Sequence, residues 1–421
     1  MNILYLLLDP THAQGHRRGG YATHVREVIA ALGAAGHRVE VLDSRAPGEK
    51  APAAPPAAAP AARRAAPGLP PALRAAGRDA AYVAYNWKAA RLVGARLAGG
   101  GIDLVYERFH HLQWAGMAAA RRHGIAAILE FNAGVNEAAA FHGAGLAWLA
   151  RRIEERTLKA ADRVITVSGV LRREVIARGV APERVVAMHN GVSTAEFHPA
   201  IDGSAFRARH RIGPEAVVVG FVGTFAPWHG VELLIEAALA LAPRAPELVF
   251  LIVGGRPDDA RFRAAAAQVE AARAAERIRL IGEIPFAAVP SAMAAMDIAT
   301  IPWATDYGSP MKIFEYMAMG KALVAPDLEV LREVFRPGEN ALLVPRGDAR
   351  ALAAAIERLA GDPALRRQLG ARARADAVAH HDWRHHAAVI AELAAAARVE
   401  RAARSAGRAP RSPAAAPAAR S

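Results

Sequence analysis

The sequence of 421 residues contains no cysteine, which excludes disulfide bonds and thiolate metal sites. Such a chain is compatible with a reducing compartment, and we predict a cytoplasmic location. Long hydrophobic runs are also missing. The apolar stretch at residues 1–8 is too short to span a membrane and has no basic leader, so we expect a buried strand there. The neighbours His110 and His111 have no third ligand at a supporting spacing, so we predict no metal site.

Acidic residues are the minority among charged ones, with 53 Lys and Arg against 40 Asp and Glu and a formal net charge of +13. A charge of this size first suggests nucleic acid. More than half of the excess, however, lies in two Ala- and Pro-rich stretches, 46–78 and 399–421, which cannot build a core. We therefore predict a mobile loop at 46–78, a disordered basic tail at 399–421 and no nucleic-acid partner. Contact with an anionic membrane surface is the partner that this charge favours.

Short apolar runs alternate with helical patterns along the chain, as is typical of parallel sheets with crossover helices. Because 421 residues are too many for one core, we predict an α/β fold with two doubly wound, Rossmann-like domains facing each other across a cleft. The domains are expected at 1–195 and 216–380, joined by a hinge at 196–215 that is rich in Pro and Gly. The predicted strands are 3–8, 38–42, 104–106, 127–131, 164–167 and 184–188, then 216–222, 248–253, 278–281, 298–301, 323–325 and 341–344.

Glycine-centred junctions follow several of these strands, where ligands of doubly wound sheets bind. The loop that ends in Gly19 and Gly20 is either a ligand-binding loop or a plain tight turn. The turn 223–230, in which Thr224 and His229 could donate to a phosphate, is alternatively a capping turn with Trp228 in an interface. A third junction, 254–256, carries an arginine suited to phosphate geometry.

The segment 309–320 is the most informative junction, because a turn opens a short helix that carries Lys312 and Glu315 and ends at a glycine. The N-terminus of a helix gathers unpaired N–H groups and a partial positive charge, which suits a phosphate. Glu315 is placed to bind ribose hydroxyls; the alternative is an amphipathic helix with a surface glutamate. In the first half, Glu107, His110 and Asn132 follow apolar strands and are expected to point into the cleft on the acceptor side.

Taken together, these motifs resemble family-4 retaining glycosyltransferases of the GT-B fold, also called group 1, over about residues 1–395. The resemblance rests on motifs that occur in the family's order: 19–20 with 36–39, 161–168, 190–192 with Phe197, 220–223, 309–318 and 382–384. It implies a helix at 381–398 that crosses back to the first domain. It also implies a UDP- or GDP-sugar as donor, a glycan or polyprenyl-linked acceptor, and no metal or other cofactor.

Carried over by position, the resemblance implies that Glu315 binds the ribose. Around it, Gly308, Ser309, Pro310 and Met311 would offer backbone N–H groups, with Gly19 and Gly20 touching the donor from the other domain. Three departures stand out. Thr224 and His229 replace an Arg and Lys that commonly follow Gly223, Tyr307 (beside Asp306) replaces a first glutamate, and Asn132 replaces a histidine.

We therefore predict transfer of a hexose with retention, in which Lys312 first and His229 second stabilise the leaving diphosphate. If protonated His229 serves the phosphate, donor affinity should decline as the pH rises past about 6.5. Two alternatives stay open: a nucleotide-sugar epimerase or phosphorylase of the same fold, and a non-catalytic scaffold subunit.

Overall fold

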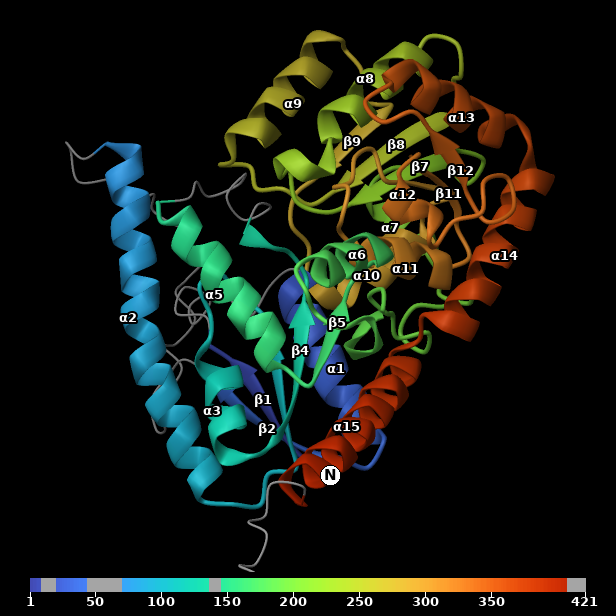
Figure 1. Cartoon of the computed structure of the whole chain (residues 1–421). Coiled ribbons are helices and arrows are strands. Elements are labelled where there is room, and N and C mark those ends of the chain that lie inside the picture. Colours follow the sequence, from blue (N-terminus) through green and yellow to red (C-terminus); the bar gives the residue numbers. More distant parts are fainter. Residues whose placement is uncertain (9–19, 44–69, 136–144, 407–421) are drawn as a thin grey trace, which may run out of the picture.

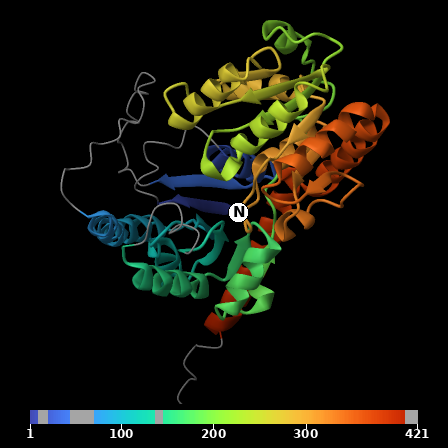
Figure 2. The ribbon, with the colours of Figure 1, turned by 90° about the horizontal axis from the view of Figure 1, so that it is seen from above.

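The computed structural model describes residues 1–8, 20–43, 70–135 and 145–406, which form two α/β domains (Figures 1 and 2). The first has a six-stranded parallel sheet in the order β2-β1-β3-β4-β5-β6. Its strands are β1 (Asn2–Leu7), β2 (Arg38–Asp43), β3 (Leu104–Arg108), β4 (Ala126–Phe131), β5 (Arg163–Thr166) and β6 (Val185–Ala187). Its helices are α1 (Gly20–Ala34), α2 (Pro71–Ala98), α3 (Ala115–His123), α5 (Ala147–Ala160) and α6 (Gly169–Ala177).

The second domain has a six-stranded parallel sheet in the order β12-β11-β10-β7-β8-β9. Its strands are β7 (Val217–Val222), β8 (Leu248–Val253), β9 (Ile278–Ile281), β10 (Ile298–Thr300), β11 (Ala322–Pro326) and β12 (Leu342–Val344). The helices are α7 (Ser204–Arg209), α8 (Val231–Leu241), α9 (Ala260–Ala271), α10 (Val289–Ala294), α11 (Met311–Ala318), α12 (Glu329–Arg332), α13 (Ala349–Gly361), α14 (Pro363–His380) and α15 (Trp383–Ala406). Every predicted strand is present, which confirms the predicted fold class.

The apolar runs are continuous because both faces of each sheet are covered by helices. On β1, Ile3 and Tyr5 point to the side of α1 and α15, whereas Leu4 and Leu6 point to the side of α2 and α3. This alternation follows from the two-residue period of a strand. Both faces of β1 are thus buried, which places the first strand at the centre of the N-terminal core.

Helix α15 leaves the C-terminal domain and packs along the N-terminal one (Figure 1). Its buried residues recur at intervals of three or four, which gives one apolar stripe facing the sheet: Trp383, Ala387, Ile390, Ala394 and Ala397. The chain passes between the domains twice, near residue 192 and again just before α15. These two segments lie side by side, since the Val192 N–H donates to the His381 carbonyl at 2.8 Å. Gly191 allows this approach, because a Cβ there would lie 2.8 Å from the Trp383 ring.

Two predicted boundaries differ from the structure. The loop predicted at 46–78 is wrong for residues 71–78, which begin α2, because alanine and arginine favour helix and proline is tolerated in the first turn; residues 44–69 lie outside the described part. The tail predicted as disordered from 399 is wrong up to 406, because α15 continues that far; 407–421 are not described. The segment predicted as a hinge, 196–215, packs on the C-terminal core through Phe197 and Ile212.

Among the described residues, no helix combines the length and apolar character needed to cross a membrane.

Candidate active site

A cavity of about 680 Å³ opens between the two domains, and residues from both line it. His24, Arg108 and Asn190 contribute from the N-terminal domain. Most residues predicted for the site also lie on its wall: Gly20, Thr224, His229, Gly308, Ser309, Pro310, Met311, Lys312 and Glu315. Gly19 lies outside the described residues. The sequence motifs therefore converge on one place, although they are spread over some 300 positions.

Helix α11 carries the two charged side chains that face this cavity from the C-terminal domain. Ile313, Phe314 and Tyr316 anchor the helix in the core, and the Tyr316 hydroxyl accepts the Val222 N–H at 2.7 Å. Lys312 and Glu315 are three positions apart and so share the opposite face. Within the described part of the chain, neither forms an ion pair or a side-chain hydrogen bond, although Glu315 is only 9% exposed.

Burial shifts the ionisation of both groups toward neutrality. Burial lowers the pKa of Lys312 to about 7, while the nearby Glu315 acts in the opposite direction. Burial raises the pKa of Glu315 to about 7, while Lys312 lowers it. Two ionisable groups of opposite charge type, without an ion pair or side-chain hydrogen bond among the described residues, suit a ligand that offers an anion to one and hydroxyl donors to the other.

Gly223 makes room for the lysine. A Cβ at this position would lie 2.5 Å from Lys312 Nζ and 2.8 Å from the Phe221 ring. The ammonium also sits 4.5 Å from the centre of that ring, in a cation–π contact. The glycine at the end of β7 is therefore needed to position the lysine, in addition to any contact with a ligand.

His229 is placed at the cavity, but its surroundings disfavour the protonated form. Burial and the charge of Lys312 lower the pKa of His229 to about 3, so the ring is neutral at physiological pH. Its Nδ1 lies 2.6 Å from the Thr224 carbonyl, an acceptor, and therefore carries the hydrogen. The free Nε2 is then an acceptor, suited to a hydroxyl group rather than a phosphate. Because the ring is already neutral well below pH 6.5, its titration should not make donor affinity decline past that pH.

The N-terminal wall of the cavity is built on a buried carboxylate, Glu130, at the end of β4. Parallel pairing places Arg108 of β3 next to it in register. Glu130 accepts hydrogen bonds from Tyr106 Oη at 2.6 Å, Arg108 Nη1 at 3.0 Å and Asn132 Nδ2 at 3.0 Å, and lies 2.8 Å from His24 Nε2. Burial raises the pKa of Glu130, but the charges of His24 and Arg108 outweigh it and hold that pKa well below its usual range.

His24 connects this carboxylate to the loop that precedes α11. Its Nδ1 lies 2.9 Å from Asn190 Oδ1, while the Asn190 N–H donates to Ser309 Oγ at 2.9 Å. Burial lowers the pKa of His24 more than Glu130 raises it, so this pKa lies below its ordinary value. Both ring nitrogens lie within hydrogen-bonding distance of an oxygen, Nδ1 of Asn190 and Nε2 of Glu130. A chain of polar contacts thus runs from the first domain to the predicted donor loop of the second.

The three residues predicted for the acceptor side do not line the cavity. Glu107 alternates with Tyr106 and Arg108 on β3, so it points to the opposite face, against Gly116 of α3. His110 packs on Tyr82 of α2, with ring centres 5.6 Å apart, and burial lowers its pKa to about 4. Asn132 binds Glu130 and supports the wall from behind. The predictions for Glu107 and His110 are therefore wrong.

Two buried carboxyl groups on neighbouring strands give a matched test of this wall. Glu130→Gln should lower the free energy of unfolding by about 1–3 kcal/mol, because His24 and Arg108 lose their charged partner. Burial raises the pKa of Glu107 from 4.5 to about 8, so at neutral pH this group is protonated in the folded protein but ionised in the unfolded chain, and Glu107→Gln should raise the free energy of unfolding there. Urea unfolding at neutral pH measures both.

The sign of the pH dependence provides the control for that test. A carboxyl whose pKa is raised by folding stabilises the protein at low pH and loses this contribution as the pH rises from about 4.5 to about 8. Glu107→Gln should remove that decline and Glu130→Gln should leave it. Equal effects of the two substitutions at neutral pH would contradict the assignment.

Asp306 and Tyr307, the neighbours at the position where the resemblance implies a first glutamate, point in different directions. Asp306 turns outward to an ion pair with Arg346 at 2.7 Å, whereas Tyr307 lines the cavity. Ser168 Oγ donates to the Tyr307 carbonyl at 2.8 Å, which joins the N-terminus of α6 to this loop. Tyr307 rather than Asp306 therefore faces the cavity.

Known proteins support the assignment of these two domains. The family model described as Glycosyltransferase Family 4 matches residues 18–196, and the model described as Glycosyl transferases group 1 matches residues 216–362. A phosphatidyl-myo-inositol mannosyltransferase of Mycolicibacterium smegmatis is 28% identical over 381 residues, which cover 87% of each chain. A D-inositol 3-phosphate glycosyltransferase of Kineococcus radiotolerans is 30% identical over 240 residues, which cover 52% of this chain and 54% of the relative.

Solved structures agree in fold. Sucrose-phosphate synthase from Thermosynechococcus elongatus superposes with a TM-score of 0.69 at 22% identity, covering 93% of this chain and 98% of that one. HepE of Anabaena superposes with a TM-score of 0.68 at 19% identity, covering 94% and 100%. The two family models follow each other in order and match the two domains that enclose the cavity. The chain therefore belongs to the family 4, group 1 glycosyltransferases, with the GT-B fold.

Proposed function

We propose that this chain transfers a hexose from a UDP- or GDP-sugar to a glycan or a lipid-linked acceptor, with retention of the anomeric configuration. The observation that carries the proposal is the cavity wall of α11, where neither Lys312 nor Glu315 forms an ion pair or a side-chain hydrogen bond among the described residues. A nucleotide sugar offers both complements, a diphosphate for the ammonium and a ribose diol for the carboxylate. HepE, which shares the fold, has been solved with UDP and with UDP-glucose.

In this proposal the donor lies along the start of α11. The backbone N–H groups of the first turn and the helix dipole favour the diphosphate there. Lys312 stabilises the charge that develops on the diphosphate as the bond between the anomeric carbon and its oxygen breaks. Arg108, which reaches the cavity from the other domain, supplies a second cation near a site where the family's Arg and Lys are absent. His229 Nε2 accepts a hydrogen bond from a sugar or ribose hydroxyl.

The cavity wall favours one route to the proposed retention. Glu315 is the only carboxylate among the described lining residues, and we assign it to the ribose. No second carboxylate on that wall is then placed to form a covalent sugar intermediate. We therefore propose a front-face displacement. The acceptor oxygen bonds to the anomeric carbon on the side that the diphosphate leaves, and a diphosphate oxygen takes the acceptor proton.

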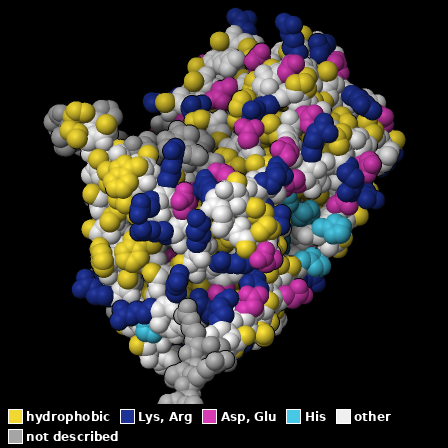
Figure 3. All heavy atoms as spheres, in the orientation of Figure 1, with side chains coloured by type: hydrophobic (Ala, Val, Ile, Leu, Met, Phe, Trp, Pro, Cys, Tyr) yellow, Lys and Arg dark blue, Asp and Glu magenta, His cyan; other side chains and the backbone are white. Residues whose placement is uncertain are grey.

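For the acceptor, we propose a lipid-linked or glycan hydroxyl near the inner face of the membrane. The relative from Mycolicibacterium smegmatis is a phosphatidyl-myo-inositol mannosyltransferase. Two tryptophans of the N-terminal domain are exposed, Trp87 on α2 at 63% and Trp148 on α5 at 69%. Figure 3 shows hydrophobic side chains beside Lys and Arg over this domain. Aromatic and basic side chains together suit an anionic membrane surface.

A panel of UDP- and GDP-sugars tests the proposal, first by thermal shift and then by transfer to simple acceptors. We expect one donor class to raise the melting temperature, and NMR of the product to show the donor's anomeric configuration. An inverted product would exclude retention. Sugar conversion without acceptor would favour an epimerase, and dependence on free phosphate a phosphorylase. A complete lack of nucleotide binding would favour a scaffold subunit.

A further inference from the structure

A second pocket, of about 360 Å³, lies far from the interdomain cavity, where the end of α15 meets the N-terminal domain. Its wall comes from the ends of α3 and α5 and from the residues that lead into β4 and β5. These are the amino ends of the strands, and the cavity that we assign to the donor lies at their carboxyl ends. The pocket is therefore separate from the proposed active site.

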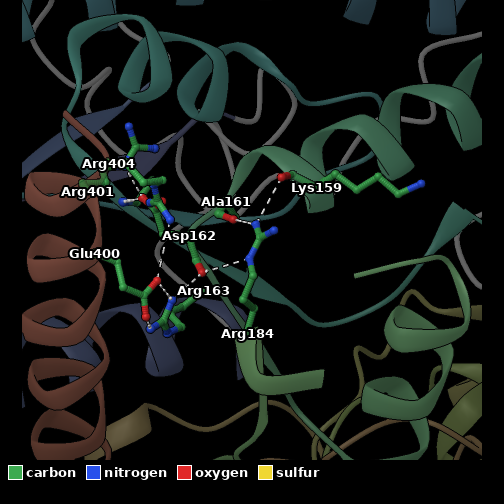
Figure 4. Close-up of polar contacts among 9 residues, drawn as sticks. Lys159, Ala161, Asp162, Arg163, Arg184, Glu400, Arg401 and Arg404 are labelled. Atoms are coloured by element: carbon green, nitrogen blue, oxygen red, sulfur yellow. Dashed lines mark hydrogen bonds and ion pairs between the residues drawn. The ribbon is translucent and has the colours of Figure 1, made fainter. Parts of the chain in front are cut away.

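Guanidinium groups dominate this wall. Arg121, Arg184, Arg401 and Arg404 line the pocket, and Asp162 is the single carboxylate among the described lining residues. Figure 4 shows Arg401 and Arg404 of α15 beside Asp162 and Arg184 beside the Ala161 carbonyl, while the Lys159 side chain extends away from them. Arginine is the side chain whose planar fork best matches the oxygens of a phosphate group.

The protein balances only part of this charge. Arg401 Nε lies 2.5 Å and Arg404 Nη2 2.9 Å from Asp162, and Arg404 Nη1 also lies 3.7 Å from Glu400. Arg184 donates to the Lys159 and Ala161 carbonyls and so caps the end of α5. Arg121 is exposed and has no ion pair among the described residues. Burial lowers the pKa of Arg184; Asp162 raises it, and the charges of Arg163 and Arg404 lower it further.

Stabilisation of helix ends accounts for only a part of this arrangement. Cations at helix C-termini contribute about 0.3–1 kcal/mol each, and Arg184 makes the direct contacts. Arg401 and Arg404 belong to another helix, and they meet the pocket only because α15 crosses from the second domain. A hollow lined by guanidinium groups from three separate elements is the geometry of an anion site.

We propose that this pocket binds a phosphate-bearing anion, which fastens the end of α15 to α3 and β5. The anion is either a soluble phosphate compound or the phosphate of a lipid head group. The proposal does not depend on the sugar transfer proposed above, because it concerns another surface and other residues.

Calorimetric titration of the full-length protein with inorganic pyrophosphate tests the site. The variant Arg121→Ala/Arg404→Ala removes two cations and leaves Asp162 paired with Arg401. The control Arg122→Ala/Arg398→Ala removes one arginine from each of the same helices, outside the pocket. We expect the first variant to weaken binding about tenfold or more, since hydrogen bonds to charged groups contribute about 1.5–3 kcal/mol each. The control should bind as the unaltered protein does.

The interdomain cavity could also bind pyrophosphate, so each titration is repeated with Lys312→Met. Binding that survives Lys312→Met and weakens in Arg121→Ala/Arg404→Ala belongs to the pocket. Equal weakening by the pocket variant and its control, or no weakening at all, would overturn the proposal. Cosedimentation with phosphatidylcholine vesicles, with and without phosphatidic acid, separates the two sources. A lipid phosphate predicts that only the pocket variant loses phosphatidic-acid-dependent binding; a soluble phosphate predicts no such difference while the calorimetric loss remains.

Discussion

Replacing Lys312 with methionine is expected to lower kcat by about 10²–10³-fold, the usual cost of removing a preorganised donor to the charge of a transition state. Methionine keeps most of the side-chain volume over the Phe221 ring but removes the charge that faces the leaving diphosphate. Because this charge matters most when the diphosphate leaves, donor affinity should fall much less than kcat. Initial rates over a range of donor concentrations measure both quantities.

Lys312→Arg is the matched control, because it keeps a positive charge in the space beside Gly223 and the Phe221 ring. Partial recovery of kcat relative to methionine would support an electrostatic role. An equal loss in both variants would point instead to packing. An unchanged kcat in Lys312→Met would remove the lysine from the mechanism.

Replacing Glu315 with glutamine should weaken binding of the nucleotide sugar by about 100-fold. Two hydroxyls of a ribose would donate to this carboxylate, and hydrogen bonds to charged groups contribute about 1.5–3 kcal/mol each. Calorimetry with the donor identified in the sugar panel measures the loss. Glu196→Gln, on a glutamate that acts on Glu315 only through its charge, should leave affinity nearly unchanged.

The two α11 variants should also show opposite pH dependence of donor affinity. A bound diphosphate raises the pKa of Lys312 from about 7, so its contribution declines as the pH rises through that value. Ribose hydroxyls that donate to Glu315 lower its pKa from about 7, so its contribution grows as the pH rises up to about that value. Glu315→Gln should therefore leave a falling profile and Lys312→Met a rising one. Profiles of the same slope would contradict the paired assignment.

The fold follows closely from the sequence because parallel strands buried on both faces give continuous apolar runs bounded by breakers. The predicted limits of 248–253 and 278–281 coincide with β8 and β9. The boundaries that failed lie in Ala- and Arg-rich segments. There composition does not distinguish a solvated loop from a helix held by long-range contacts, such as those of Arg401 and Arg404 with Asp162.

The site was predictable where one short segment contributes several neighbouring residues to it, as the turn and helix start at residues 308–315 do. It was not predictable where function depends on which face of a strand a residue occupies. Glu107 and Glu130 both end apolar strands, and the alternation of side chains along β3 was the signal that separates Arg108 from Glu107. His24 and Asn190 could not be identified, because 166 positions separate the two residues whose side chains meet.

A crystal structure of the protein with the nucleotide of its donor tests the central claim most directly. Our account predicts a nucleotide in the interdomain cavity, with both ribose hydroxyls within hydrogen-bonding distance of Glu315 and the phosphates facing Lys312 at the start of α11. A nucleotide bound outside this cavity, or one whose ribose does not contact Glu315, would contradict it.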